Sequence, residues 1–371
     1  MCRDDAGGVA GDVHSQGVTG VGTTDLFDRI ADLPVRIEGY DLATRERDTS
    51  SGFTRKTTVV TLAGADHGGR GEDVTYESEE HDRLLEAHDF DLTGEHTVAS
   101  FSASLEAVDL FPAGPPAEAR FRHYRRWAFE SAALDLALRQ ADTTLADALD
   151  RTYDPVRFVA STRLGEPPSA DRVHALLDRV PGIELKLDPT PGWSLDLIDD
   201  LAATDAVRIL DLKAGYEGTE VATETDPTLY RTLLSAFPEA IIEDPGVTEE
   251  TESMLEEAGD RLSWDLPIEG LEDVRALPWE PRWLNVKPSR FGTVESLFET
   301  VEHCLDAGIR MYGGGQFELG VGRGQIQALA SLCYPEGPND VAPGVYNDPE
   351  LPKSAPASPL APPEEPEGFR W

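Results

Sequence analysis

The second half of the chain repeats one pattern, in which a short apolar segment is followed by a polar turn and an amphipathic helix. The apolar segments that we expect to be strands lie at 156–161, 183–187, 207–212, 240–244, 262–265, 283–287 and 309–313. Helical patterns between them are clearest at 169–180, 226–237 and 294–308. Strands that alternate with helices form parallel βαβ units. This rhythm favours an α/β fold with a TIM-type barrel over residues 151–345, and an open doubly wound sheet is the alternative.

The segment before the barrel, residues 31–150, has the pattern of a smaller domain with both strands and helices. Antiparallel strands are expected at 35–42, 57–65 and 72–76. A polar loop over 43–56 would join the first two strands, and a turn at 67–71 would precede the third. A helix is expected over 121–141, because apolar residues recur there three and four positions apart.

The two ends of the chain look unlike either domain. Residues 1–30 carry little periodicity and predict a loose tail, and the Pro-rich residues 346–371 predict an extended arm. The first residues lack the basic start and apolar stretch of a signal peptide. Because the chain has no run of about 20 apolar residues, we expect no membrane span.

Charge limits the partners and suggests the environment. The net charge of −38, from 70 acidic and 32 basic residues, argues against nucleic-acid binding. The acidic residues are spread along the chain, which favours an acidic surface adapted to concentrated salt over a disordered acidic tail. The three cysteines, at 2, 304 and 333, form neither a disulfide framework nor a zinc motif. These features predict a halophilic, cytoplasmic protein.

Charged residues end most of the expected barrel strands. In chain order they are Lys186, then Asp211 with Lys213, then Glu243, Asp265 and Lys287, with Gly313–Gly315 and Glu318 following the seventh strand. The carboxyl ends of barrel strands form the mouth in which active sites lie. Because side chains alternate along a strand, these groups are expected to point into that mouth. The same residue types are common as isolated helix caps or solvated charges, but five on successive strands indicate a site.

Three carboxylates that converge in a dry mouth repel each other unless a cation lies between them. Oxygen ligands favour Mg²⁺, with Mn²⁺ as an alternative, so Asp211, Glu243 and Asp265 are candidate metal ligands. Such a metal would bind a small-molecule carboxylate and stabilise the enediolate formed when the α-proton leaves. The metal and the neighbouring ammonium groups are expected to lower the pKa of Lys186 or Lys287, so that one acts as a base.

These residues resemble the enolase superfamily. The run includes Glu243-Asp244-Pro245, Lys287-Pro288 and GGGQFELGVGRGQIQALASL, and the Gly71-Glu72 pair and ESAALDLAL fit in the N-terminal part. The closest branch holds muconate-lactonising enzymes, o-succinylbenzoate synthases and dipeptide epimerases. The resemblance covers roughly residues 35–345 and implies an α+β capping domain followed by a (β/α)₇β barrel.

The resemblance also implies roles for individual residues. Lys186 and Lys287 would lie on opposite faces of the substrate, one as a base and the other as an acid or as a cation that stabilises the enolate. The glycines 314 and 315 and Glu318 would line the pocket, and the loop 43–56 would close over it. The reaction would end in epimerisation, cycloisomerisation or elimination. Family members often form symmetric assemblies, which makes a homo-oligomer an outcome to test.

The sequence departs from the family at two positions. The second strand usually carries two lysines one residue apart, but Glu184 stands at the first position; in a register shifted by two, Asp188 would replace the second lysine. Lys213 stands where Asn is common, and it would bind a second acidic group of the substrate or form a salt bridge to Asp188 or Glu217. These two departures motivate one alternative, a non-catalytic relative that binds an acid ligand. A second alternative is an acid-sugar dehydratase.

Overall fold

The structure, a computed structural model, describes residues 26–215, 223–351 and 353–371. It confirms the predicted fold class: a curved parallel sheet of seven strands is preceded by a smaller domain with antiparallel strands. Glu217 lies outside the described residues. Among the described residues, no helix is both long enough and apolar enough to cross a membrane.

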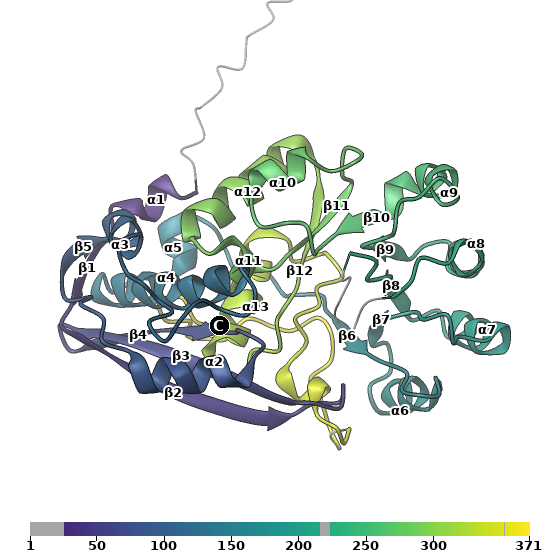
Figure 1. Ribbon diagram of the computed structural model, residues 1–371, viewed down its shortest axis with the longest axis horizontal. Helices are drawn as coiled ribbons and strands as arrows, with labels where there is room; N and C mark the ends of the chain where they lie inside the picture. The colour runs from purple at the N-terminus through teal and green to yellow at the C-terminus, as the bar shows by residue number, and fades with distance from the viewer. Residues whose placement is uncertain (1–25, 216–222, 352) are drawn as a thin grey trace, which may run out of the picture.

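The barrel strands and helices follow one another in the predicted order. The strands are β6 Val159–Thr162, β7 Glu184–Leu187, β8 Val207–Asp211, β9 Ile241–Glu243, β10 Leu262–Trp264, β11 Trp283–Val286 and β12 Arg310–Gly313. The helices are α6 Asp171–Arg179, α7 Leu195–Ala203, α8 Pro227–Ala236, α9 Glu252–Glu257, α10 Leu271–Arg275, α11 Pro288–Phe291, α12 Val294–Ala307 and α13 Val321–Cys333. Figure 1 shows α6 to α9 outside the curved row of strands, as expected for βα units.

A short segment after α13 closes the barrel. The strands β12 and β6 are the two edges of the seven-stranded sheet, and Asn339 and Asp340 lie between them. Phe158 bridges to Asn339, and Gly314 bridges to Asp340, both in parallel orientation. The Asn339 side chain accepts from the N–H of Gly313 at 2.6 Å and donates to the Arg157 carbonyl at 2.9 Å. This segment therefore occupies the position of an eighth strand, which the sequence did not reveal as a strand.

Strand periodicity places alternate side chains inside the barrel, as predicted. Ile209 is fully buried against Val159, Ile241 and Tyr312, which come from three other strands. Its neighbour Leu210 belongs instead to the large core between strands and helices. Because Asp211 lies two residues after Ile209, its side chain points toward the barrel axis.

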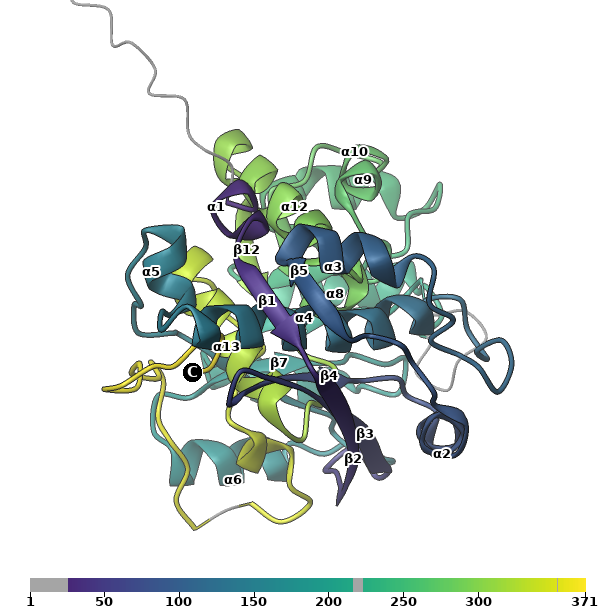
Figure 2. The ribbon, with the colours of Figure 1, turned by 90° about the vertical axis from the view of Figure 1, so that its left-hand side faces the viewer.

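The smaller domain packs one long helix on an antiparallel sheet. Its elements are α1 Asp28–Ala31, β1 Pro34–Ile37, β2 Gly39–Asp48, β3 Thr54–Gly64, β4 His67–Asp73, α2 Ser78–Ala87, β5 Gly94–Thr97, α3 Val98–Leu105, α4 Phe121–Gln140 and α5 Leu145–Leu149. The helix α4 agrees with the predicted helix 121–141. In Figure 2 the strands of this domain lie in front of the barrel elements, so the domain covers one side of the barrel.

Two glycines of β4 allow α4 to lie directly on the sheet. A Cβ atom on Gly71 would lie 2.0 Å from the Ala128 carbonyl oxygen, and one on Gly69 would lie 2.2 Å from the Ala132 carbonyl oxygen. Backbone atoms cannot move aside as a side chain can, so these positions require glycine.

The segment 43–56, predicted as a loop, is instead most of a β-hairpin. Strands β2 and β3 pair from Gly39 to Asp48, and only residues 49–53 form the turn. The side chains of β2 are exposed or half-exposed, so the apolar alternation that signals a strand is missing. The hairpin tip lies beside the loop after β12, where the rings of Phe53 and Phe317 are 5.4 Å apart.

The predicted turn at 67–71 is also wrong, because these residues begin β4. The chain reverses earlier, at Ala65 and Asp66, which have φ angles of 49° and 64°. Two consecutive residues with positive φ are typical of a tight hairpin turn. The glycines in HGGRG therefore serve helix packing rather than chain reversal.

Both ends of the described chain pack more closely than the sequence suggested. Leu26 and Ile30, expected in the loose tail, are buried in the main core, and Ile30 belongs to α1. The arm after residue 346 contains no helix beyond the short turn Gly344–Asn347 in its described part, but Phe369 near its end is fully buried. Asp135 of α4 accepts from the Phe369 N–H at 3.0 Å and from the Arg370 guanidinium at 2.9 Å.

Candidate active site

Lysines and carboxylates alternate at the carboxyl ends of the barrel strands. The Lys186 Nζ lies 2.6 Å from Glu243 Oε1 and 3.2 Å from Asp211 Oδ2, and all three side chains are buried. Thus β7, β8 and β9 each contribute one charged group to the same point. Lys186 therefore lies against two of the predicted metal ligands.

Glu184 takes no part in this cluster. It lies at the start of β7, where its carboxylate binds Arg157 at 2.6 Å and Arg208 at 2.7 Å. Its carboxylate therefore occupies the other end of the strand from the Lys186 contacts. The choice between the two registers considered above therefore stays a prediction.

A second group forms at the ends of β10 and β11. The Lys287 Nζ lies 2.7 Å from Asp265 Oδ2, and Arg290 of α11 lies 3.3 Å from the same oxygen. Arg290 also donates to the Asp265 main-chain carbonyl at 2.8 Å. Although burial alone would raise the pKa of Asp265, Arg290 and Lys287 hold it well below its usual range. Asp265 is therefore ionised and oriented by two cations.

The carboxylates of Asp211, Glu243 and Asp244 can present ligand atoms within 4.8 Å of one another. Asp211 Oδ1 is buried and has no hydrogen-bond partner within the described part of the chain. Burial raises the pKa of Glu243 to about 7 and that of Asp244 to about 8, and the neighbouring carboxylates add to both increases. Two carboxyl groups that resist ionisation, next to the ionised Asp211, form a cluster of hard oxygen atoms that fits a divalent cation.

Asp244 was not expected at this site. It follows β9 with a φ of 46°, and its two carboxylate oxygens accept from the N–H groups of Asp265 and Leu266 at 2.8 and 2.9 Å. These bonds hold the end of β10 against the end of β9. Asp244 thus has a positioning role that is visible only in three dimensions.

The electrostatic state of Lys186 depends on its surroundings. Burial lowers the pKa of Lys186, but Glu243, Asp211 and Asp340 outweigh burial and raise it well above its usual range. The lowered pKa expected from the sequence therefore requires that a metal ion neutralise these carboxylates.

Three further side chains complete the inner wall. Tyr312 donates to Glu243 Oε2 at 2.6 Å, and Asn285 donates to Glu243 Oε1 at 3.0 Å. Asp340, on the segment that closes the barrel, lies 3.6 Å from Lys186. Alternation within β11 and β12 would have shown that Asn285 and Tyr312 face inward, whereas Asp340 follows no strand pattern.

The glycine-rich segment after β12 packs closely against this wall. A Cβ atom on Gly314 would lie 2.3 Å from Asn285 Oδ1 and 2.8 Å from Lys287 Cε, so the backbone passes directly over both residues. Gly315 lies near Glu318, which accepts from the Gln316 N–H at 2.7 Å and pairs with Arg323 at 3.2 Å. The structure therefore brings Gly314 next to Lys287, and Glu318 next to Gly315.

The capping domain holds this segment through Glu72 of β4. The Glu72 carboxylate accepts from the N–H groups of Leu319, Gly320 and Gly322 at 2.7 to 3.0 Å, at the start of α13. A carboxylate is favoured at the N-terminus of a helix, where N–H groups lack partners. The sequence GVGRG is thus the turn into a helix, with an anion supplied by the protein itself.

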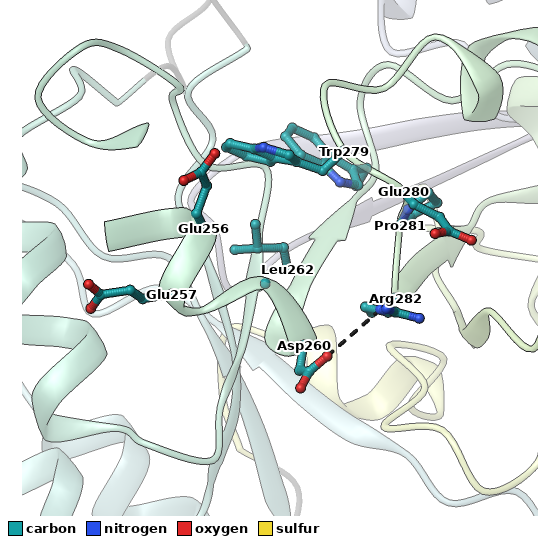
Figure 3. A pocket seen from close by; sticks show the side chains of 10 residues that line it. Glu256, Glu257, Asp260, Leu262, Trp279, Glu280, Pro281 and Arg282 are labelled. Atoms are coloured by element: carbon teal, nitrogen blue, oxygen red, sulfur yellow. Dashed lines mark ion pairs between the residues drawn. The ribbon is translucent and has the colours of Figure 1, made fainter. Parts of the chain in front are cut away.

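A cavity of about 330 Å³ lies elsewhere, next to the starts of β10 and β11. Figure 3 shows Leu262 and the ring of Trp279 at this cavity, with Asp260 paired to Arg282 at its edge. Leu262 begins β10, so this cavity lies at the opposite end of the strand from Asp265. It is separate from the cluster of lysines and carboxylates.

Similar proteins agree with the fold. The chain is 28% identical over 308 residues to an N-succinylamino acid racemase from Amycolatopsis sp., covering 77% of this chain and 76% of the relative. Among solved structures, a member of the enolase superfamily from Listeria innocua Clip11262 matches with a TM-score of 0.59 at 19% identity, over 84% of this chain and 86% of that one. A dipeptide epimerase from Methylococcus capsulatus, complexed with a Mg ion, matches with a TM-score of 0.61 at 18% identity, over 81% and 88%.

The fold and the charged strand ends define a member of the enolase superfamily, a superfamily of enzymes, which confirms the resemblance seen in the sequence. More narrowly, the chain belongs to the family described as "Domain of unknown function (DUF8230)". Its N-terminal domain matches residues 28–148, and its C-terminal domain matches residues 152–348.

Proposed function

We propose that this protein is a Mg²⁺-dependent enzyme that removes the proton next to a substrate carboxylate. The observation that carries the proposal is the pairing of two lysines with separate carboxylates in one barrel mouth. Lys186 lies against Asp211 and Glu243, and Lys287 lies against Asp265. Each lysine is thereby fixed at a point from which it can exchange a proton with a substrate.

Asp211, Glu243 and Asp265 would hold the metal, with Asp211 offering its Oδ1 atom. When bound, Mg²⁺ would supply positive charge that offsets the negative charge gained by the substrate carboxylate as the proton leaves. Lys186 would accept the proton at Nζ once the carboxylates around it are neutralised. Lys287 would face the other side of the substrate and donate a proton or stabilise negative charge.

Gly314, Gly315 and Glu318 would line the part of the pocket next to Lys287. The close backbone approach at Gly314 supports this assignment, because a larger residue would displace the Lys287 side chain. The hairpin tip at 49–53 would narrow the entrance beside Phe317. The substrate would be a small carboxylic acid, and the reaction would end in epimerisation, cycloisomerisation or elimination.

The relative and the structural neighbour named above guide the choice of substrates. The test is exchange of the α-proton in D₂O, monitored by NMR, with N-acyl amino acids, dipeptides and sugar acids. We expect Mg²⁺-dependent exchange with at least one acyl amino acid or dipeptide, and loss of exchange in Lys186→Met and Lys287→Met. A keto-acid product would indicate the dehydratase alternative. Failure of wild-type protein to exchange any α-proton would favour a protein that only binds an acid ligand.

A further inference from the structure

Lys213 has an unusual backbone conformation at the end of β8. Its φ angle is 50°, in the left-handed region that a residue with a side chain rarely adopts. Such a conformation costs about 1–2 kcal/mol for a residue other than glycine or asparagine. It folds the chain back just after Asp211, so that the lysine side chain returns toward the strand end. Strain retained at a candidate site suggests a function for the side chain.

The Lys213 ammonium group lies between two carboxylates. Its Nζ is 2.5 Å from Asp211 Oδ2 and 3.6 Å from Asp188 Oδ2. Asp188 follows β7 and is also held by Arg163 at 3.2 Å. The sequence left open whether Lys213 contacts Asp188 or a substrate, and the structure shows the contact with Asp188 together with a shorter one to Asp211.

These contacts make the two carboxylate oxygens of Asp211 unequal. Oδ2 receives both Lys213 and Lys186, at 2.5 and 3.2 Å, whereas Oδ1 is buried with no hydrogen-bond partner in the described ranges. A carboxylate held through one oxygen presents the other in a fixed direction. The same ammonium group places a positive charge next to the position that a metal ion would take.

We propose that Lys213 is a positioning residue of the metal centre, which orients Asp211 and weakens the binding of divalent cations. Asp188 limits the weakening by sharing the ammonium group. The inference rests on the proposed function, because it assumes that Asp211 is a metal ligand. It differs from the expectation that Lys213 binds the substrate.

Substitutions of Lys213 and of Asp188 are expected to change the metal affinity in opposite directions. Lys213→Met removes a positive charge beside the metal position and should tighten metal binding at least tenfold. Asp188→Asn removes a carboxylate that shares the ammonium group with Asp211 and should weaken binding severalfold. A merely structural role would weaken binding in both variants, and a misfolded variant could not gain affinity.

The experiment is an EPR titration with Mn²⁺, used as a spectroscopic probe for Mg²⁺, on the full-length protein in about 2 M KCl to screen the acidic surface. Lys213→Arg keeps the charge and should bind like wild type. Lys353→Met removes the same charge from the exposed arm and should also bind like wild type. Asp211→Asn should abolish the tight site.

The outcomes separate the two proposals. If Asp211→Asn loses the site but Lys213→Met binds no more tightly than wild type, the inference about Lys213 is wrong and the metal site stands. If wild type has no tight site, or Asp211→Asn binds as well as wild type, the metal-dependent function is wrong and the inference about Lys213 falls with it.

Discussion

Glu72 joins the two domains at the candidate site, so its removal should be costly. Its carboxylate accepts hydrogen bonds from the Thr57 hydroxyl and from three main-chain N–H groups at the start of α13. Of these N–H groups, that of Gly322 is buried and the other two are half-buried. Each buried donor left without an acceptor costs about 1–3 kcal/mol.

The expected magnitudes follow from that count. Glu72→Ala leaves all three N–H groups without the carboxylate, and partial access of water to two of them brings the loss to about 4 kcal/mol. Glu72→Gln keeps one oxygen but turns an NH₂ group toward the donors, so we expect a loss of about 2 kcal/mol. The free energy of unfolding would be measured by urea titration in about 2 M KCl, where the acidic surface is screened.

The control is Glu38→Ala, which removes an exposed carboxylate paired with Arg36 at 3.1 Å. An exposed pair contributes about 0–1 kcal/mol, so this variant should resemble wild type. A loss below about 1 kcal/mol for Glu72→Ala would refute the reasoning, because it would mean that water satisfies the start of α13 equally well.

Three further predictions concern packing and pH. Gly71→Ala should lower the free energy of unfolding by about 3 kcal/mol or more, because its Cβ would meet a backbone oxygen at 2.0 Å, whereas Gly68→Ala, with its nearest contact at 3.8 Å, should be tolerated in the same urea titration. Phe369→Ala should cost about 3 kcal/mol or free the arm for proteolysis, since the ring is fully buried, and an unchanged digestion pattern with unchanged stability would contradict this. Burial lowers the pKa of His81 below 6.5, so the unfolded chain binds this proton more readily and stability should fall as the pH drops below about 6.5. His81→Gln should flatten that part of a stability–pH curve, whereas the exposed His67→Gln should leave it unchanged.

The sequence predicted the parts of the fold whose pattern is local. The barrel strands could be predicted because each is a short, mainly apolar segment. The helix α4 could be predicted because its apolar residues recur with helical spacing. Once the strands were predicted, the residues at their carboxyl ends were known as well. The charged residues among them could therefore be named together as Lys186, Asp211, Glu243, Asp265 and Lys287. The structure brings Lys186 to Asp211 and Glu243, and Lys287 to Asp265, while the catalytic roles of these residues stay a prediction.

Other features depend on contacts between distant segments. The hairpin of β2 and β3 was missed because the side chains of β2 lack a buried face. The segment at Asn339 and Asp340 that closes the barrel is too short to show the alternation of a strand. It is recognised only by its bridges to Phe158 and Gly314. The link from Glu72 to α13 joins residues about 250 positions apart, so no local pattern contains it.

The distribution of lysine argues that the charged cluster serves chemistry rather than stability. Only five residues of the chain are lysine, and three of them, Lys186, Lys213 and Lys287, lie within 3.2 Å of carboxylates at the strand ends. In the capping domain, the fully buried carboxylate Asp73 is instead paired with an arginine, Arg125, at 2.8 Å. Arginine is the better residue for a fixed ion pair, because it is always charged and binds carboxylates through two nitrogens. Lysine differs in that burial and neighbouring charges can make it lose its proton. Lysine at positions where arginine would bind carboxylates more firmly is what we expect if the proposed proton transfer takes place at Lys186 and Lys287.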